Sequence, residues 1–349
     1  MTTTYPSSDG AVVLVTGGTG SFGSTMVRRL LANGAAQVRV LSRDELKQHE
    51  MRTEIGSDRL RFYLGDVRNR ESVDRAMPGV DLVFHAAALK QVPSCEFFPM
   101  EAVLTNVMGS HNVIESAARN GVHSVVCLGT DKAAYPINAM GMTKALMEKT
   151  AQAFGRNNPE STTRVSTVRY GNVMCSRGSV IPLFISQLRN GRPMTVTDPE
   201  MTRFLMSLDD AVELVEYAFR SAHPGDLFIR KAPACTVGAL ATAVAELLDT
   251  EPEIDIVGTR HGEKLYETLA TREELSRAQD RGQFFRVAVD ARDLNYEQYF
   301  DEGDIFAGAA DDYHSHNTER LGVAEVKSVL ANLPEFRTLV RASERFEQR

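Results

Sequence analysis

The sequence contains few cysteines, and they are widely separated. Cys95, Cys127, Cys175 and Cys235 have neither the spacing of metal ligands nor that of a redox-active pair. This pattern argues against a cysteine-based metal centre, and no metal site is expected. We therefore expect reduced thiols in a cytoplasmic protein.

Long apolar runs and clusters of basic charge are also missing. No apolar run approaches the roughly 18 residues that a membrane-spanning helix needs, and residues 1–10, MTTTYPSSDG, lack the basic start and apolar centre of a signal peptide. The net charge is −7, and Lys and Arg form no block, which disfavours a nucleic-acid partner. We expect a soluble protein with a flexible tail over residues 1–10 and without membrane or nucleic-acid partners. An anionic ligand remains compatible with this charge, because local sites can be positive.

The first half of the chain alternates short β-like runs with helix-like stretches. This rhythm predicts a parallel sheet covered by helices on both faces. We therefore expect an α/β fold, with a Rossmann-type doubly wound sheet over residues 11–175 to which later segments can add strands. The β-like runs are 12–15, 38–41, 60–64, 82–85, 124–128 and 165–168.

After about residue 175 the rhythm becomes irregular. Turn signals are frequent, and helix-like stretches near 209–221, 236–249 and 323–332 alternate with short strands. We expect a smaller, mixed α/β substrate-binding domain over 176–349, with a C-terminal extension. This domain is predicted to complete a cleft at the carboxyl edge of the sheet, where open α/β sheets bind ligands.

A glycine-rich turn follows the first expected strand and opens a helix. Gly17, Gly20 and Gly23 have the spacing Gly-x-x-Gly-x-x-Gly, which lets a pyrophosphate approach the helix N-terminus. The position between strand and helix makes this a specific signal for a dinucleotide site. Thr19, Ser21 and Phe22 belong to the same predicted cofactor turn.

The end of the second strand discriminates between NAD and NADP. Ser42, Arg43 and Lys47 supply a hydroxyl and two cations where a 2′-phosphate would lie, which favours NADP. The alternative is a solvated charged turn in which Asp44 binds a ribose. Further expected cofactor contacts are Asp66 and Val67 after the third strand and Ala86 and Ala88 after the fourth.

An acid and a base stand side by side after the fifth strand, at Asp131 and Lys132. They can act as general acid and general base if the site moves their pKa values towards neutrality. The alternative is an ordinary surface ion pair. Lys144 follows on a helix and can hold the nicotinamide ribose, whereas Met140, on the same helix face four residues earlier, cannot take a proton.

Two further reactive side chains are interpreted as structural. His85 ends the fourth strand and is expected to be packed rather than catalytic. Cys95 lies near the expected cleft and is expected to be an inert thiol. Neither is included among the predicted catalytic residues.

Together these segments resemble the extended short-chain dehydrogenase/reductase superfamily. Within it they are most similar to the configuration-inverting UDP-N-acetylglucosamine 4,6-dehydratases of capsule and O-antigen polysaccharide biosynthesis, over roughly residues 12–330. The strings 136–141 and 312–318 resemble the soluble branch of that family. The other matching strings are 16–23, 42–48, 65–68, 86–93, 130–144, 169–173, 176–184, 197–204 and 258–267.

The resemblance implies a lyase reaction with internal redox. NADP would oxidise carbon 4 of UDP-N-acetylglucosamine, Lys132 would remove the carbon 5 proton, and Asp131 would protonate the hydroxyl leaving carbon 6, with Thr130 beside them. Return of the hydride to carbon 6 and inversion at carbon 5 would give UDP-2-acetamido-2,6-dideoxy-β-L-arabino-hex-4-ulose. Most of the superfamily has tyrosine at the place of Met140, so Lys132 is also the expected base for oxidation, with Tyr135 as the alternative.

The same resemblance assigns the substrate side and the assembly. Lys90 is expected between cofactor and sugar, and Val173 and Met140 beside the cofactor. Family members are often homo-oligomers, commonly hexamers. The expected contacts to the sugar nucleotide are Lys90, Asn172, Val180, Arg203 and Arg260.

Two other functions compete with the dehydratase. A nucleotide-sugar epimerase shares the fold and the cofactor but has no use for an acid aimed at carbon 6, so the Asp131–Lys132 pair favours the dehydratase. A catalytically silent NADP-binding regulator would explain Met140. The retained Asp131, Lys132 and Lys144 argue against it.

Overall fold

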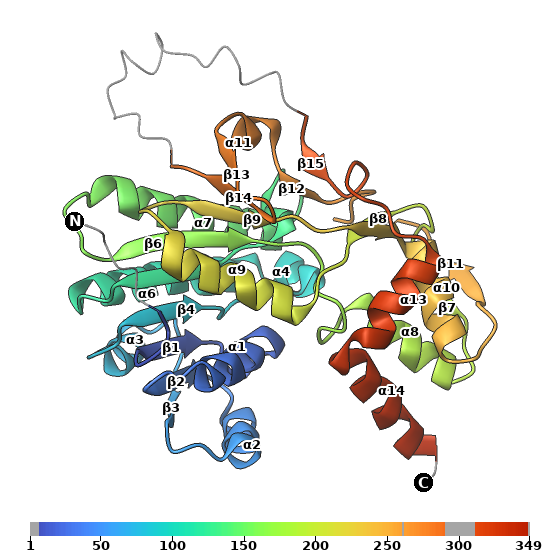
Figure 1. The fold of residues 1–349 in the computed structure, drawn as a ribbon, viewed down its shortest axis with the longest axis horizontal. Coiled ribbons are helices and arrows are strands. Elements are labelled where there is room, and N and C mark those ends of the chain that lie inside the picture. Colours follow the sequence, from blue (N-terminus) through green and yellow to red (C-terminus); the bar gives the residue numbers. More distant parts are fainter. Residues whose placement is uncertain (1–6, 260–261, 290–310, 348–349) are drawn as a thin grey trace. The chain divides into compact units, whose positions relative to one another are not determined.

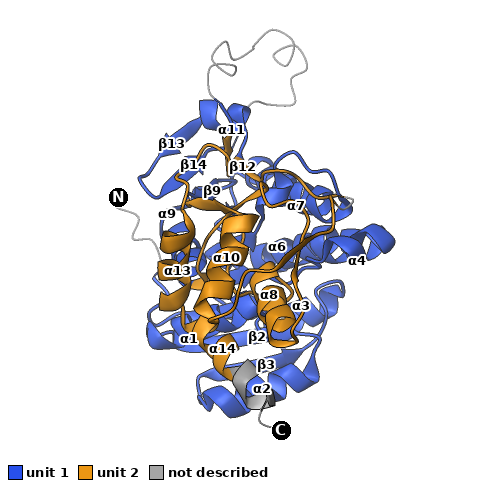
Figure 2. Ribbon diagram, turned by 90° about the vertical axis from the view of Figure 1, so that its right-hand side faces the viewer, with its two compact units in different colours: residues 1–170, 209–231, 270–312 blue, residues 171–208, 232–269, 313–349 orange. Residues whose placement is uncertain are grey.

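The computed structural model describes residues 7–259, 262–289 and 311–347. The chain forms two compact units, shown separately coloured in Figure 2. Unit 1 contains Met1–Tyr170, Asp209–Lys231 and Ala270–Asp312, and unit 2 contains Gly171–Leu208, Ala232–Leu269 and Tyr313–Arg349. Later segments thus return to the unit that holds the N-terminal half.

Over the residues that the structure describes, unit 1 is built on a nine-stranded sheet (Figure 1) with the strand order β13-β14-β9-β6-β5-β4-β1-β2-β3. The strands from β3 to β9 are parallel to their neighbours, and β14 and β13 add an antiparallel edge. The order reverses at β1, which lies between β2 and β4, and this is the switch point at which such sheets bind ligands. The bounds are β1 Val12–Thr16, β2 Gln37–Ser42, β3 Leu60–Leu64, β4 Leu82–His85, β5 Ser124–Leu128, β6 Arg164–Arg169, β9 Leu227–Arg230, β13 Ala278–Asp280 and β14 Phe284–Val287.

Helices pack on both faces of this sheet. Leu14 and Val83 belong to a buried cluster with residues of α3, α6 and α7. Because side chains alternate along a strand, Phe84 points to the other face, where its ring lies 5.2 Å from that of Phe22 in α1. The doubly wound, Rossmann-type fold predicted from the sequence is therefore confirmed. The bounds are α1 Ser21–Ala32, α2 Glu45–Ile55, α3 Arg70–Ala76, α4 Val92–Phe97, α5 Pro99–Ala102, η1 Val103–Met108, α6 Gly109–Arg119, η2 Asp131–Ala133, α7 Ala139–Asn157, α9 Leu208–Ser221 and α11 Arg272–Ser276.

Unit 2 is smaller and mixed, as expected for the later part of the chain. Its short strands pair two by two, β7 with β11 in parallel and β8 with β10 in antiparallel fashion. Its buried core joins Ile181 and Phe184 of α8 to Leu240 of α10 and Leu330 of α13. The bounds are α8 Val180–Arg189, β7 Met194–Val196, β8 Thr202–Phe204, β10 Ala234–Thr236, α10 Val237–Leu247, β11 Ile254–Ile256, β12 Thr268–Ala270, β15 Tyr313–His314, α13 Val323–Asn332 and α14 Pro334–Glu347.

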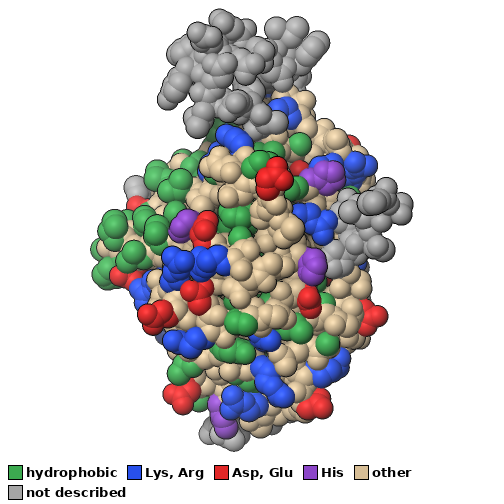
Figure 3. Space-filling view, turned by 90° about the vertical axis from the view of Figure 1, so that its left-hand side faces the viewer, with side chains coloured by type: hydrophobic (Ala, Val, Ile, Leu, Met, Phe, Trp, Pro, Cys, Tyr) green, Lys and Arg blue, Asp and Glu red, His purple; other side chains and the backbone are tan. Residues whose placement is uncertain are grey.

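No helix within the described ranges of the chain has both the length and the apolar character needed to cross a bilayer. On the face drawn in Figure 3, acidic and basic side chains are interspersed rather than gathered by sign.

Candidate active site

The glycine-rich turn lies between β1 and α1 and is packed too tightly for other residues. Gly17 has φ +67°, and a Cβ there would lie 2.8 Å from the backbone of Ala87. A Cβ on Gly23 would lie 2.4 Å from the carbonyl oxygen of Gly17. The backbone of the turn is thereby held close to the end of β4, which leaves no side chain between it and a ligand at the helix N-terminus.

Helix α1 begins without a side-chain cap. Gly20 is its N-cap residue, and the first turn, which opens with Ser21 and Phe22, carries no acidic side chain. The unsatisfied N–H groups and the helix dipole favour an anion at such an end. The turn therefore fits the pyrophosphate of a dinucleotide.

At the end of β2, the acidic side chain points to its own helix and the basic side chains are more exposed. Asp44 is the N-cap of α2: its carboxylate accepts the Lys47 N–H at 3.0 Å and also pairs with the Lys47 ammonium. The hydroxyl of buried Ser42 accepts a hydrogen bond from Gln48 at 3.1 Å. Arg43 extends into solvent, with 51% of its side chain exposed, and Nη1 lies 3.4 Å from Asp66. The two cations are thus the more exposed groups, whereas the acid caps its own helix.

Asp66 and Val67 follow β3. Partial burial would raise the pKa of Asp66, but hydrogen bonds from Arg68 and the charges of Arg68 and Arg43 outweigh it and lower that pKa. The carboxylate is therefore ionised at neutral pH. Val67 is buried, and its side chain packs close to Gly109 of α6.

His85 ends β4 as a buried structural residue. Its Nδ1 lies 2.7 Å from Thr16 Oγ1 and its Nε2 lies 2.8 Å from Ser110 Oγ. Burial and the nearby Lys144 charge lower the pKa of His85 to about 3, so the ring is neutral. The expectation of a packed strand-end residue is confirmed. Ala86 and Ala88 follow in the segment that approaches the glycine turn.

Asp131 and Lys132 lie in contact directly after β5. Asp131 is 1% exposed, and its Oδ1 accepts hydrogen bonds from Lys132 Nζ at 3.1 Å and from Thr130 Oγ1 at 2.8 Å. Its Oδ2 is buried and has no hydrogen-bond partner within the described parts of the chain. The backbone N–H of Asp131 is held by the Tyr170 carbonyl at 3.1 Å. Asp131 is thus buried and held by several hydrogen bonds, whereas the side chain of Lys132 is 24% exposed.

Lys144 is buried in α7 and binds the end of the same strand. Its Nζ donates to the carbonyl oxygen of Leu128 at 2.6 Å. Burial lowers the pKa of Lys144 to about 8, although nearby Cys127 and Glu148 oppose this shift. An amine near its pKa at neutral to mildly alkaline pH suits a role beside a cofactor or a proton-transfer step.

Met140 and Tyr135 lie in different environments. Met140 is 4% exposed and packs in a small apolar cluster with Cys95 and Ala102. Tyr135 is 48% exposed, and its hydroxyl donates to Asp312 Oδ1 at 3.0 Å. Partial burial and this bond to Asp312 raise the pKa of Tyr135.

Cys95 is buried and its pKa is raised, first by burial and then by Glu96, as expected for an inert thiol.

Asn106 helps to position the site, and the sequence analysis did not identify it. It is fully buried in the π-helical turn η1, where its amide accepts the Leu89 N–H at 2.8 Å and donates to the Leu89 carbonyl and to Thr143. It therefore fixes the backbone next to Lys90, whose side chain is exposed, and ties it to the helix of Lys144. A single Asn inside an apolar helical stretch carries no sequence signal for this role.

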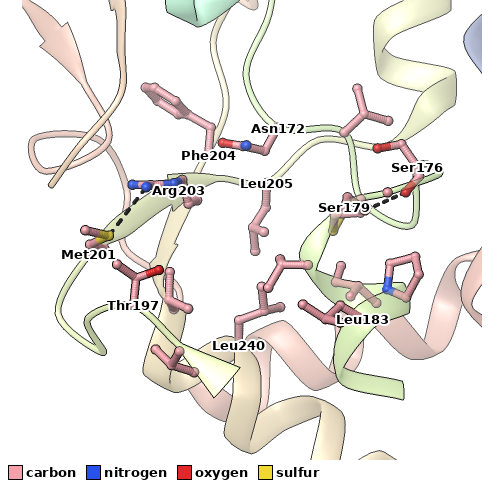
Figure 4. A pocket seen from close by; sticks show the side chains of 18 of the residues that line it. Asn172, Ser176, Ser179, Leu183, Thr197, Met201, Arg203, Phe204, Leu205 and Leu240 are labelled. Atoms are coloured by element: carbon pink, nitrogen blue, oxygen red, sulfur yellow. Dashed lines mark hydrogen bonds between the residues drawn. The ribbon is translucent and has the colours of Figure 1, made fainter. Parts of the chain in front are cut away.

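Unit 2 contains a cavity of about 600 Å³ that collects most of the expected substrate residues. Asn172, Val180 and Arg203 line it, as does Val173, which was expected beside the cofactor. Figure 4 labels Asn172 and Arg203 in the wall. Nη1 of Arg203 donates to the Thr202 carbonyl at 2.8 Å and lies 3.4 Å from the Leu265 carbonyl, which holds the guanidinium along the wall. The volume is within the usual range for a small-molecule site. Arg260 lies outside the described residues.

The fold and the nucleotide-binding turn define a protein of the extended short-chain dehydrogenase/reductase type. Residues 13–289 match the family described as "Polysaccharide biosynthesis protein", and residues 290–337 match "Polysaccharide biosynthesis protein C-terminal". The chain belongs to this family, within the nucleotide-sugar epimerase and dehydratase group of the superfamily.

Individual relatives carry different activities in their names. A "UDP-glucose 4-epimerase" of Rickettsia conorii and another of Rickettsia felis are each 53% identical over 325 residues, which is 92% of this chain and 95% of theirs. The X-ray structure of Pen from Bacillus thuringiensis is 34% identical, with a TM-score of 0.85 over 93% of this chain and 99% of that one. DesIV, a dTDP-glucose 4,6-dehydratase from Streptomyces venezuelae with NAD bound, is 25% identical, with a TM-score of 0.67 over 73% of this chain and 86% of its own.

Proposed function

We propose that the protein is a UDP-N-acetylglucosamine 4,6-dehydratase that inverts carbon 5 and retains NADP. The observation that carries this proposal is the contact between Lys132 and buried Asp131 at the carboxyl end of β5. An elimination needs a base for the proton at carbon 5 and an acid for the hydroxyl leaving carbon 6. An adjacent amine and carboxyl group can serve both steps.

The pair reaches the required protonation states by one proton shift. Removal of the carbon 5 proton needs Lys132 as a neutral amine, and protonation of the leaving hydroxyl needs Asp131 as a carboxylic acid. Transfer of one proton from Lys132 Nζ to Asp131 Oδ1 across the 3.1 Å contact converts the ion pair into this neutral pair. The transferred proton lies on Oδ1, the atom in contact with Lys132 Nζ, and we assign this oxygen to protonate the hydroxyl leaving carbon 6.

Lys132, as the neutral amine, is also the residue we assign to take the proton of the hydroxyl that is oxidised at carbon 4. This uptake makes Lys132 the ammonium of the ion pair, and the proton shift to Asp131 then restores the amine for the carbon 5 proton. Tyr135 is disfavoured for this step because its hydroxyl donates to Asp312 and its pKa is raised. Met140 carries no basic atom. Lys144 keeps the role of orienting the nicotinamide ribose, since its ammonium already lies at the end of β5.

The cofactor turn and the end of β2 support NADP. When bound, this nucleotide supplies the oxidation at carbon 4 and returns the hydride to carbon 6. The uncapped α1 N-terminus suits the pyrophosphate. Arg43 and Lys47 are exposed cations for a 2′-phosphate, and Asp44 is directed to its own helix and to Lys47. An NAD site would instead use an acid for the ribose hydroxyls.

The cavity in unit 2 is the proposed site for the sugar nucleotide. Arg203 supplies a guanidinium for the diphosphate, and Asn172 and Val180 line the same space. UDP-sugars appear in the names of the 53% identical relatives, which supports a UDP-linked substrate. Lys90 is assigned to the sugar on the side of the cofactor.

The test is proton NMR of UDP-N-acetylglucosamine incubated with the purified protein in deuterated water. A dehydratase gives a new methyl signal, loss of the carbon 6 hydroxymethyl signals and deuterium at carbon 5, and the ring couplings report inversion. Retention of the hydroxymethyl group with a changed stereocentre would establish an epimerase instead. An unchanged sugar in the presence of bound NADP would refute the proposed substrate.

A UDP-sugar 4-epimerase is the second candidate, because relatives that share 53% identity over 325 residues bear the name UDP-glucose 4-epimerase. The same experiment with UDP-glucose measures this activity. Epimerisation requires no acid at carbon 6, so Asp131→Asn separates the two functions. The substitution is expected to slow water loss about 10²–10⁴-fold in a dehydratase and to spare the interconversion of UDP-glucose and UDP-galactose in an epimerase.

A further inference from the structure

A largely buried ion cluster of Glu148, Arg169 and Glu274 adjoins the backbone on either side of Asp131, and the reaction proposed above does not use it. We propose that Glu274 of α11 is a positioning residue that acts through Arg169 and Glu148 on the loop of Asp131 and Lys132. This inference rests on the proposed function only in its prediction for turnover. Its structural part can be tested without any reaction.

Arg169, the last residue of β6, bridges two carboxylates. Its Nε and Nη2 donate to Glu148 at 3.2 and 2.5 Å, and its Nη1 and Nη2 donate to Glu274 at 2.8 and 2.9 Å. The side chains of Arg169 and Glu148 are 3% and 4% exposed, and that of Glu274 is 20% exposed. Both contacts are bidentate, so the guanidinium fixes the orientation of both carboxylates.

Glu148, whose orientation Arg169 fixes, contacts the backbone that precedes the catalytic pair. A Cβ on Gly129 would lie 2.4 Å from Glu148 Oε1, so the carboxylate packs directly on that glycine. Lys144, one helical turn earlier on α7, binds the carbonyl of Leu128 at 2.6 Å. The two side chains therefore hold consecutive residues at the end of β5, and Thr130 follows immediately.

Arg169 also adjoins the second backbone support of the loop. Tyr170 is the next residue, and its carbonyl accepts the N–H of Asp131 at 3.1 Å. A displacement of Arg169 therefore moves the acceptor that holds Asp131. The cluster therefore adjoins the catalytic loop at two places: Glu148 packs on Gly129, and Arg169 precedes Tyr170, which binds Asp131.

Glu274 links the cluster to a separate part of the chain. Its carboxylate closes a capping box at the start of α11, where Oε2 accepts the Thr271 N–H at 2.9 Å. The same helix is tied to the far end of the loop by Asp312, whose Oδ1 accepts the Arg272 N–H at 2.6 Å and the Tyr135 hydroxyl at 3.0 Å. Tyr135 has φ +47°, a conformation that costs energy and needs such support. Helix α11 thus supports the loop at both of its ends.

Stability alone does not explain a cluster of this kind. Taking charges out of water offsets much of the attraction between them, and apolar replacements of buried ion pairs are often at least as stable. Such a cluster is better suited to fixing the positions of the side chains and backbone that it contacts. The Asp131–Lys132 contact needs defined geometry because misplacement by about 1 Å can cost about 100-fold in rate.

The experiment compares Glu274→Gln with Glu273→Gln on the same helix. Glu273 is a matched control because its side chain is 72% exposed and lies 3.6 Å from Arg277. For each variant, hydrogen–deuterium exchange is measured in the peptides that cover residues 129–135, together with thermal unfolding and the kcat and KM for the sugar nucleotide. Glu274→Gln is expected to speed exchange in this segment and to lower kcat about tenfold or more, with KM within about threefold. Glu273→Gln is expected to match the wild type.

Unchanged exchange in residues 129–135 in folded Glu274→Gln would overturn the inference, as would an equal effect of Glu273→Gln. If Glu274→Gln does not fold, Asp312→Asn breaks the second tie and must produce the same local increase in exchange. A protein that lacks dehydratase activity altogether, yet shows the local increase, refutes the proposed function and leaves the positioning role supported. A fall in kcat without any local increase assigns Glu274 another role and refutes the inference.

Discussion

At the scale of single residues, the acid and the base of the proposed site are separable by substitution. Asp131→Asn removes the proton donor for carbon 6, and Lys132→Ala removes the base for carbon 5. Each variant is expected to lose about 10²–10⁴-fold in turnover, the usual contribution of a positioned proton transfer. Binding of NADP, measured by fluorescence titration, should persist in both.

Lys149→Ala is the control for this pair of substitutions because Lys149 lies exposed on α7. It should keep wild-type turnover. Near-wild-type rates for either Asp131→Asn or Lys132→Ala would remove that residue from the mechanism.

Arg43 provides a test of cofactor choice. Its guanidinium is half exposed and pairs only weakly with Asp66 at 3.4 Å, so it can turn towards a 2′-phosphate. Arg43→Ala should raise the Kd for NADP about tenfold, since a hydrogen bond to a charged group contributes about 1.5–3 kcal/mol, and leave the Kd for NAD nearly unchanged. Isothermal titration with both nucleotides measures this. Equal weakening of both would show that Arg43 does not contact the 2′ position.

Substitutions of Met140 test whether this position serves packing or chemistry, since the superfamily resemblance leads one to expect a tyrosine here. Because the side chain is buried against Cys95 and Ala102, Met140→Tyr should lower the free energy of unfolding by about 1–3 kcal/mol through overpacking. Met140→Leu, which nearly conserves volume, should cost less than about 1.5 kcal/mol. Urea unfolding measures both. A stable Met140→Tyr variant with faster turnover would mean that the site lacks a base that tyrosine can restore.

At the scale of elements, His85 joins β4 to β1 and α6 through Thr16 and Ser110. Its pKa in the folded protein is about 3, below the ordinary value of 6.5. Between these pH values the unfolded chain binds a proton that the folded protein does not, so stability falls as pH decreases from about 6.5 to about 3.

This titration can be isolated by substitution. His85→Gln keeps a hydrogen-bonding side chain but cannot titrate, so the difference in unfolding free energy between wild type and variant should shrink as pH falls through this window. Urea unfolding at pH 7, 5.5 and 4.5 measures the difference. The other charge facing the ring is Lys144, which stays protonated throughout. A difference that is constant with pH would show that His85 does not titrate as described.

The elements of the first half could be predicted because their signals are local. The run 165–168 becomes β6, and the glycine spacing marks the turn that opens α1, because alternation and glycine geometry need only neighbouring residues. Asn106 and the Glu148–Arg169–Glu274 cluster could not be predicted. Their roles arise from contacts such as the one between Arg169 and Glu274, which are 105 residues apart, and no local pattern encodes such pairing.

At the scale of the whole molecule, the chain leaves unit 1 after Tyr170 and returns to it twice. The sequence placed the division at residue 175 because the regular alternation of strands and helices stops there. The structure adds β9, β14 and β13 to the sheet from residues 227–287. These three strands are short, and nothing near them in the sequence states that β9 pairs with β6, some 60 residues earlier.

This topology predicts that residues 1–175 do not form a stable domain by themselves. Without β9 the fragment exposes the edge of β6, where Val165 and Val168 are fully buried in the complete chain, and a long apolar edge invites aggregation. The isolated fragment should therefore be insoluble, or bind a hydrophobic dye and lack a cooperative thermal transition. The complete chain is the control. A soluble fragment 1–175 that unfolds cooperatively and binds NADP would show that the parallel strands β1 to β6 suffice, and that the returning segments serve the substrate side alone.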